Sequence, residues 1–139
     1  MSRKSTGEYP PNWNEISDEV KEAAGRRCVR CDHIHDVENG FMLTVHHLDM
    51  NKSNCAWWNL VALCQRCHLR IQGKVIMERT WMMEHSAWFR PYVAGYYAHA
   101  YGLREDREYV TAWADQCIAL GQGKITIWDD AVLEFSFPE

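Results

Sequence analysis

The chain contains no run of about 18 apolar residues, the length that a helix needs to cross a membrane, so we expect neither a membrane span nor a membrane partner. Its first residues also lack the apolar segment of a secretory signal. Six cysteines in a chain without an export signal indicate a reducing compartment, and we therefore expect a cytoplasmic protein. Under reducing conditions paired cysteines are more often metal ligands than disulfides.

The sequence also lacks an excess of positive charge, which nucleic-acid-binding proteins usually show as a basic face. The formal net charge is −4 at pH 7. Residues 1–75 contain ten Lys and Arg against nine Asp and Glu, whereas residues 76–139 contain five against ten. A polyanion is therefore expected to contact the first half, and the acidic second half is a candidate docking surface for a protein partner. The residues that we expect to contact nucleic acid, unless they are only solvated surface charges, are Arg26, Arg30, Lys52, Arg66 and Arg70.

The length of 139 residues, 47% of them hydrophobic, fits one domain or a small domain with a helical appendage. Helical and strand patterns both occur, which predicts an α+β fold. We divide the chain into a flexible N-terminal tail at residues 1–12, a core at residues 13–75 and a helical C-terminal extension at residues 76–139.

The core region alternates between helical and strand patterns. Residues 13–24 carry apolar side chains at helical spacing, and Gly25 follows as a C-cap. Residues 41–46 and residues 60–63 are predicted strands, joined by a polar loop. A further helix is predicted to begin near His68.

The second half has mainly helical patterns. Residues 74–120 are typical of two or three helices, one of which starts at Pro91. A further apolar stripe ends at Gly121 and consists of Tyr109, Trp113, Cys117 and Leu120. The C-terminal residues LEFSF alternate like a strand. Cys55 and Cys117 are expected to be small buried hydrophobic side chains.

Four cysteines form two C-x2-C pairs separated by 32 residues, Cys28 with Cys31 and Cys64 with Cys67. Each pair places two thiolates on a tight turn, and two such turns provide the tetrahedral ligand set that zinc prefers. A redox-active C-x2-C is the alternative, but that chemistry needs one pair in a βαβ setting. The sequence therefore predicts a structural Zn²⁺ site that encloses the strand and loop between the two pairs.

Three histidines and one asparagine lie inside and beside this cysteine framework. His46 and His47 are adjacent at the end of a predicted strand, so their side chains should point to opposite faces. One of them can then bind a metal while its neighbour faces a substrate. Asn59 precedes the second strand, and His68 directly follows the second cysteine pair. A lone histidine is more often structural than catalytic, but four suitable groups in a zinc framework favour a functional site.

The segment VHHLDMNKSNCAWWNLVALCQRCH resembles the HNH endonuclease family, in the variant with two C-x2-C pairs. The shared pattern is a histidine or aspartate followed by a histidine, then an asparagine, then a histidine at the start of a helix. The resemblance extends over residues 13–72 and includes WNEISDEVKEAAGRRCVRC. It implies a small, zinc-stabilised ββα-metal nuclease core with an N-terminal helix and a helical C-terminal extension.

The resemblance also implies a role for each residue of the pattern. His47 matches the general base, and His46 matches the first metal ligand. Asn59 matches the middle asparagine, which orients the base or contacts the metal in different relatives. His68 matches the metal ligand on the last helix. The implied function is a metal-dependent endonuclease that hydrolyses phosphodiester bonds of double-stranded DNA in a bacterial cell or a phage-infected host.

One position departs from the family pattern. Many relatives carry a further histidine one helical turn after His68, where this chain has Gln72, a weak ligand. We therefore expect the catalytic metal to be held by His46, His68 and waters, with Asp49 as a potential helper. Waters in an octahedral sphere favour Mg²⁺ or Mn²⁺, and imidazole ligands also suit Zn²⁺ or Ni²⁺.

Two alternatives to the enzyme remain open. A non-catalytic zinc module that binds nucleic acid or protein agrees with Gln72 and with the acidic charge, whereas the adjacent pair His46 and His47 favours the enzyme. A subunit that is active only within a larger assembly, such as a phage packaging or defence system, agrees with the acidic second half.

Overall fold

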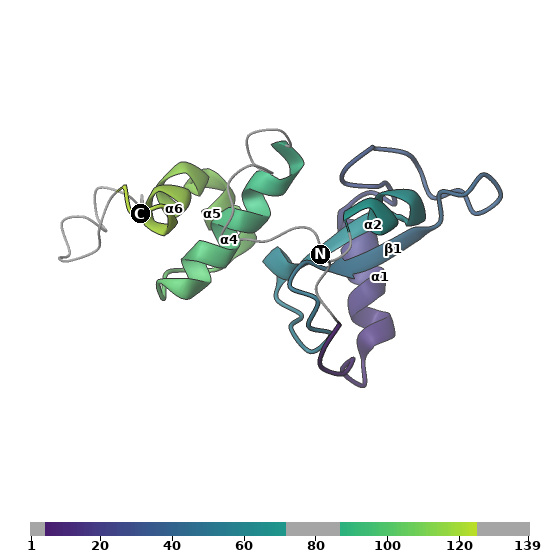
Figure 1. Cartoon of the computed structure of the whole chain (residues 1–139), viewed down its shortest axis with the longest axis horizontal. Helices are drawn as coiled ribbons and strands as arrows, with labels where there is room; N and C mark the ends of the chain where they lie inside the picture. The colour runs from purple at the N-terminus through teal and green to yellow at the C-terminus, as the bar shows by residue number, and fades with distance from the viewer. Residues whose placement is uncertain (1–4, 72–86, 125–139) are drawn as a thin grey trace. The chain divides into compact units, whose positions relative to one another are not determined.

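The computed structural model describes residues 5–71 and 87–124 of the chain (Figure 1). The chain divides into two compact units, Met1–Arg79 and Thr80–Glu139, and each is considered by itself. The described elements are helices and one small two-stranded antiparallel sheet, so the fold class is α+β, as predicted. No helix in these two described stretches is long and apolar enough to cross a membrane.

The first unit begins with helix α1 (Trp13–Ala23), which confirms the helix predicted at residues 13–24. Its charges suit the helix dipole, because Glu15 lies in the first turn and Lys21 in the last. Gly25 then adopts a φ of 67°, a left-handed conformation that favours glycine, and the chain leaves the helical direction there.

Two strands form the sheet, β1 (Leu43–His47) and β2 (Leu60–Cys64), and they pair antiparallel along their whole length. All residues of β2 are buried, so this strand forms the centre of the core. β1 begins two residues later than predicted, because Phe41 pairs with Asp36 in a separate turn. It also continues one residue further, so that His47 lies within the strand.

Helix α2 (Gln65–Ile71) follows β2 directly and begins three residues before the predicted start at His68. Figure 1 shows α1 and α2 beside the sheet. The His47 ring contacts Trp13 of α1, and the neighbouring His46 ring contacts His68 of α2. The adjacent histidines of β1 thus contact different helices, which agrees with the expectation that neighbouring strand residues point to opposite faces.

The segment before α1, predicted to be a flexible tail, pairs with the loop that joins the two strands. Thr6 forms a bridge with Asn51: its N–H donates to Met50 O at 2.8 Å, and the Lys52 N–H donates to Thr6 O at 2.9 Å. Gly7 has a φ of 69°, and a Cβ there would overlap Asn51 Oδ1, so the close approach requires glycine. The described part of this segment is therefore bonded into the first unit.

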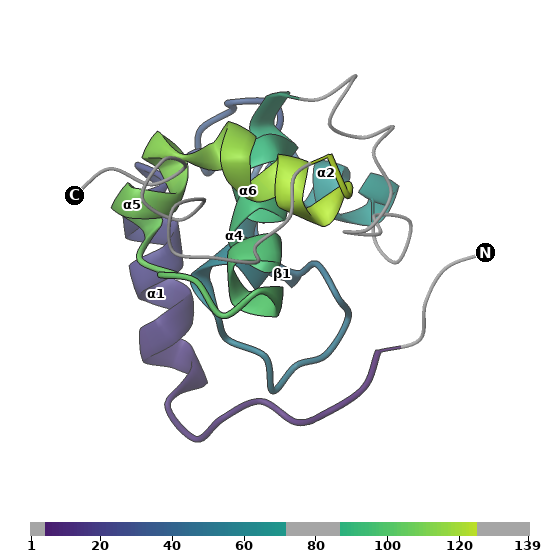
Figure 2. The ribbon, with the colours of Figure 1, turned by 90° about the vertical axis from the view of Figure 1, so that its left-hand side faces the viewer.

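The second unit contains the short turn η2 (Ala87–Phe89) and the helices α4 (Arg90–Ala100), α5 (Arg107–Ala112) and α6 (Ala114–Gly121). The three helices pack together as one group, as both views show (Figure 1, Figure 2). Their shared core is apolar, and its fully buried residues include Phe89, Val93, Ala94, Ala98 and Val110.

Helix α4 starts where Pro91 predicts it. The apolar stripe beginning at residue 109 runs over two helices, because the chain leaves the helical conformation at Trp113, with a φ of −119° and a ψ of 29°. A Cβ at Gly121 would overlap the Tyr97 ring, so glycine allows α6 to end against α4. Cys117 is 1% exposed, which confirms its prediction as a buried hydrophobic side chain. The predicted C-terminal strand LEFSF lies outside the described residues.

Candidate functional site

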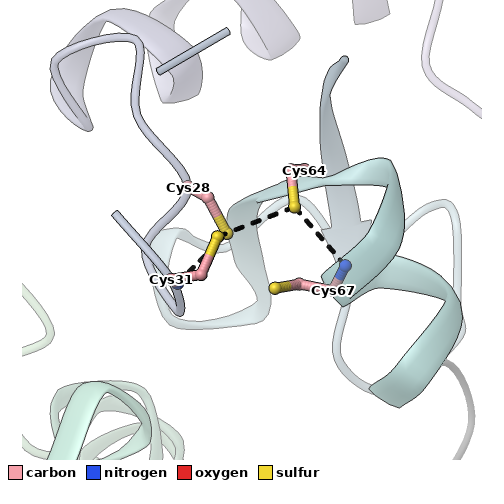
Figure 3. Close-up of side chains that lie close together, drawn as sticks. All are labelled: Cys28, Cys31, Cys64 and Cys67. Atoms are coloured by element: carbon pink, nitrogen blue, oxygen red, sulfur yellow. Dashed lines mark hydrogen bonds between the residues drawn. The ribbon is translucent and has the colours of Figure 1, made fainter. Parts of the chain in front are cut away.

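The four paired cysteines come together in the first unit. Cys28 and Cys31 lie on the turn after α1, Cys64 ends β2 and Cys67 lies in α2, and their sulfur atoms point toward one another (Figure 3). All four sulfurs lie within 4.8 Å of one another, and those of Cys31 and Cys64 are 3.8 Å apart. Four sulfurs at about 2.3 Å from one zinc ion are separated by roughly 3.8 Å in a tetrahedron. The cluster therefore fits a structural metal site such as zinc, as predicted.

Each cysteine pair is folded as a metal-binding turn. The Cys31 N–H donates to Cys28 Sγ and the Cys67 N–H donates to Cys64 Sγ, each at 3.5 Å. Burial raises the pKa of Cys67 to about 12 and also raises the pKa of Cys31. At Cys28 burial acts in the same direction, but hydrogen bonds from backbone N–H groups outweigh it and lower the pKa. The four neighbouring thiols therefore do not all ionise near neutral pH on their own. A divalent cation supplies the positive charge that keeps such thiols deprotonated.

Arg30 contacts this cysteine cluster. Its Nη1 donates a hydrogen bond to Cys67 Sγ at 3.3 Å. A zinc ion bound by the four thiolates would carry a net negative charge, and the Arg30 guanidinium would partly offset it. The sequence predicts Arg30 as a nucleic-acid contact, and that role stays a prediction, because Arg30 is exposed as well as bonded to the cysteine cluster.

His46 and His68 face each other between β1 and α2. Their ring centroids are 4.6 Å apart. His46 is 2% exposed, and its Nε2 is buried with no hydrogen-bond partner among the described residues. Burial lowers the pKa of His46 to about 3 and also lowers the pKa of His68, so both imidazoles are neutral near pH 7. Neutral imidazole is the form that binds a metal ion.

His47 lies on the other face of β1, against aromatic residues of the N-terminal region. Its ring centroid is 4.9 Å from that of Trp13 and 5.8 Å from that of Tyr9. His47 is 5% exposed, and its Nε2 is buried without a partner in the described part of the chain. Burial lowers the pKa of His47, although the Asp49 carboxylate acts in the opposite direction. Sequence reasoning did not connect Trp13 or Tyr9 with this histidine.

The end of β1 borders a cavity of about 130 Å³. Its lining consists of His46, His47 and His68 together with Ser5, Tyr9, Val45, Met50 and Lys52. Although the two adjacent histidines leave the strand in opposite directions, both therefore border the same space. Lys52 Nζ lies 5.3 Å from the centre of the Tyr9 ring, so the loop supplies a positive charge beside the three imidazoles.

Asn59 is fully buried, and its side chain holds the loop that follows β1. Its Oδ1 accepts from the Asp49 N–H at 2.9 Å, and its Nδ2 donates to Asp49 Oδ1 and to Asn54 O, each at 2.8 Å. Both amide hydrogens are thus used within the loop. The sequence predicts that Asn59 orients the base or contacts the metal. These hydrogen bonds connect it to the loop that follows His47, and its role toward a base or a metal stays a prediction.

The Asp49 carboxylate is held by the same loop. Its Oδ1 accepts from the Asn51 N–H as well as from Asn59, and its Oδ2 accepts from Asn54 Nδ2, each at 2.8 Å. Met50, the next residue, has a φ of 63°, a conformation that a side chain other than glycine adopts only when its surroundings enforce it. Asp49 and the asparagines therefore fix the shape of the loop that carries Lys52.

Among the described residues, the four cysteines are the one group of three or more potential metal ligands. His46 and His68 accordingly form a pair, and Asp49, the potential helper predicted from the sequence, does not complete a group of three with them. Gln72, which replaces the further histidine of the family pattern, lies outside the described residues.

The other predicted nucleic-acid contacts have different surroundings. Arg26 is held by α1, because its Nη2 lies 2.6 Å from Glu22 Oε1. Arg66 donates to a backbone oxygen of the loop before β1 at 3.0 Å, and Arg70 is exposed on α2. Of the five predicted residues, Lys52 is the one that borders the histidine cavity.

Comparisons with known proteins give no match. No protein-family model matches the chain, and neither a curated protein nor a solved structure shows significant similarity to it. The HNH resemblance therefore rests on the residues of the sequence, and the function has to be argued from the geometry of the site.

Proposed function

We propose that the protein is a metal-dependent endonuclease that hydrolyses phosphodiester bonds of DNA, with His47 as the general base and a divalent metal ion held by His46 and His68. The observation that carries this proposal is the cavity that all three imidazoles border. Burial favours the neutral form of each ring, which is the form needed both by a general base and by a metal ligand. The HNH pattern of the sequence assigns the same roles to the same three residues.

A structural zinc ion alone does not account for these histidines. The four cysteine sulfurs would complete the coordination of a zinc ion without any histidine. The Nε2 atoms of His46 and His47 are buried without partners among the described residues, and an unpaired buried polar group costs about 1–3 kcal/mol. Water or a ligand in the cavity would supply those partners, and open imidazole nitrogens at a cavity agree with a binding site.

In the proposed reaction each residue acts from the position described. His47 Nε2 accepts a proton from the water that attacks phosphorus. Lys52 places a positive charge beside the phosphodiester, and Asn59 keeps its loop in place through Asp49. A bound divalent cation would stabilise charge on the phosphate and on the leaving 3′ oxygen.

One observation favours a second function. In the described part of the chain, His46 and His68 do not belong to a group of three or more His, Cys, Asp or Glu whose ligand atoms lie close together, and Mg²⁺ and Mn²⁺ prefer oxygen ligands. A non-catalytic zinc module that binds nucleic acid would contain the same cysteine cluster and Lys52 without needing the second metal. The two functions differ in whether bound DNA is cut.

The test is cleavage of supercoiled plasmid by zinc-loaded protein in the presence of Mg²⁺, Mn²⁺, Ni²⁺ or Zn²⁺. We expect conversion to nicked or linear DNA with at least one of these metals. DNA binding without conversion in any of them would support the non-catalytic module instead.

The rate of cleavage is expected to stay constant on acidification until the pH is below 6.5. Burial lowers the pKa of His47 from its ordinary value of 6.5, and the pKa values of His46 and His68 move in the same direction. A lowered pKa means that each imidazole is still neutral at pH 6.5 and becomes protonated only at lower pH. The measurement is a rate–pH profile at fixed ionic strength and at two saturating Mn²⁺ concentrations. An acidic midpoint above pH 6.5 at both concentrations would contradict control of the rate by these buried rings.

Lys52→Glu is expected to weaken DNA binding, because Lys52 supplies a positive charge at the histidine cavity. The measurement uses a His47→Gln background, which is expected to bind DNA without cutting it. There Kd should rise by about tenfold, and the slope of log Kd against log salt concentration should fall by about the amount that one phosphate contact contributes. Arg104→Glu is the matched control, since Arg104 belongs to the second unit, where no nucleic-acid contact is predicted, and its guanidinium pairs with the Asp106 carboxylate. Fluorescence anisotropy of a short duplex at several salt concentrations measures both quantities. A larger effect of Arg104→Glu would show that the DNA contacts the second unit instead.

A further inference from the structure

Thr44 lies two residues before His46, on the same face of β1. Its Oγ1 makes two short contacts, 2.7 Å to the backbone oxygen of Leu63 and 2.8 Å to Nδ1 of His68. Leu63 is the residue opposite Thr44 in the strand ladder, and His68 belongs to α2. One hydroxyl therefore connects both strands with the histidine on the helix.

The direction of these two hydrogen bonds follows from the atoms available. A carbonyl oxygen can only accept, so the single hydroxyl hydrogen of Thr44 points to Leu63 O. The contact with His68 then takes its hydrogen from the ring, and Nδ1 donates it to Thr44 Oγ1. A neutral His68 in this state has its hydrogen on Nδ1 and its lone pair on Nε2.

This tautomer bears directly on the histidine pair. With Nδ1 used as a donor, Nε2 is the one nitrogen that His68 can offer to a cation. The ring of His46 lies 4.6 Å away, and both residues border the same cavity. Since they do not belong to a group of three or more His, Cys, Asp or Glu with ligand atoms close together within the described residues, binding depends strongly on two rings with the correct tautomer and orientation.

We infer that Thr44 is a positioning residue for a divalent cation: its hydroxyl holds His68 in the Nδ1–H tautomer and so presents Nε2 to an ion shared with His46. This inference rests on the proposed function, because it concerns the same metal ion. The Leu63 carbonyl fixes the hydroxyl hydrogen, so the strand ladder determines the tautomer of a side chain on α2.

The test replaces Thr44 with valine and with serine in the full, zinc-loaded chain. Valine keeps the branched shape that suits a strand but has no hydroxyl, whereas serine keeps the hydroxyl and loses only the methyl group. Thr111→Val is the matched control, because the Thr111 hydroxyl also donates to a backbone oxygen, that of Arg107 at 2.7 Å in α5. Zinc content and thermal midpoint establish that each variant is folded.

Two separate measurements determine the affinity for the metal ion and the tautomer of His68. The first is Mn²⁺ affinity, determined from the electron paramagnetic resonance signal of free Mn²⁺ at a pH where the imidazoles are neutral. Thr44→Val should bind Mn²⁺ about 10- to 100-fold more weakly, and Thr44→Ser and Thr111→Val should bind it as the wild type does. The second is the long-range ¹H–¹⁵N spectrum of the histidine rings, in which His68 should carry its hydrogen on Nδ1 in the wild type and in Thr44→Ser.

The outcomes separate this inference from the proposed function. Equal Mn²⁺ affinity of the wild type and Thr44→Val would overturn the role of Thr44. A His68 hydrogen on Nε2 in the wild type would also overturn it, and this measurement decides even when valine impairs folding. A wild type that binds neither Mn²⁺ nor Ni²⁺ nor a second Zn²⁺ would overturn the histidine pair and this inference with it. Mn²⁺ binding that depends on Thr44, in a protein that does not cut DNA, would support the positioning role and overturn the nuclease.

Discussion

Cys64→Ser is expected to abolish zinc binding and to unfold the first unit, while the ¹H–¹⁵N signals of residues in α4, α5 and α6 persist. Cys64 is fully buried at the junction of β2 and α2. Loss of its thiolate leaves an incomplete ligand set in the centre of the core. Apparent zinc binding to structural sites is worth roughly 10–16 kcal/mol, comparable with the net stability of a whole domain, about 5–15 kcal/mol. The first unit therefore should not remain folded without the ion.

Zinc content by mass spectrometry and the ¹H–¹⁵N spectrum of the full chain measure these two effects, since the spectrum reports on each unit separately. The wild type should hold about one tightly bound zinc ion per chain. Cys55→Ser is the matched control, because it makes the same chemical change in the same unit at a half-buried cysteine outside the cluster. A Cys64→Ser protein that keeps its zinc and a wild-type spectrum would refute the proposed ligand set.

His47→Gln is expected to lower the rate of plasmid cleavage by about 10²- to 10⁴-fold, the range that a general base contributes. The glutamine amide fills much of the space of the imidazole beside Trp13 but does not accept a proton from water near neutral pH. The fold and the zinc content should be unchanged. Mn²⁺ affinity should also change little, because His47 lies on the opposite face of β1 from the pair His46 and His68.

The matched control for this substitution is His99→Gln. His99 is an exposed histidine of α4 that pairs with Glu105 in the second unit, so its loss should leave the cleavage rate at the wild-type value. Cleavage by His47→Gln at the wild-type rate would assign the base to another residue. A parallel loss of cleavage and of Mn²⁺ binding would instead place His47 among the metal ligands.

Local sequence patterns predicted much of the first unit. The spacing of the two C-x2-C pairs predicted a metal-binding cluster, and the four sulfurs meet within 4.8 Å. Strand alternation predicted that His46 and His47 diverge, and their rings contact His68 and Trp13 on opposite faces. Both patterns work because they depend on the geometry of a turn or a strand, which the local sequence determines.

Contacts between distant segments were not predictable in this way. The bridge of Thr6 with Asn51 depends on the shape of a loop, which no local pattern in the N-terminal segment reveals. In the sequence, Arg30 is indistinguishable from an ordinary surface charge, and its hydrogen bond with Cys67 is seen only in the folded structure. Thr44 lies two residues before His46, so strand alternation places both on one face and gives a weak sequence indication that Thr44 is near the site. Its hydrogen bonds could not be predicted, because they depend on where α2 packs.

The break between α5 and α6 shows the same limit in the second unit. The apolar period continues through Trp113, but the Trp113 N–H is shared between Tyr109 O and Val110 O at 3.1 and 3.2 Å. Such shared hydrogen bonds are common at helix ends. Periodicity describes which face is buried, and it does not indicate where the backbone hydrogen bonds stop.

Cys67 and His68 are consecutive residues of α2, so the cysteine cluster and the proposed catalytic pair share one helical turn. A chelator strong enough to extract thiolate-bound zinc would therefore disturb His68 as well as remove any ion beside it. Inhibition by such a chelator would not by itself identify which ion cleavage needs. Mg²⁺ or Mn²⁺ added alone should not restore the turn, whereas zinc supplied before the second metal should. Protein purified in a chelating buffer would therefore appear inactive toward DNA for a reason that has nothing to do with the proposed base.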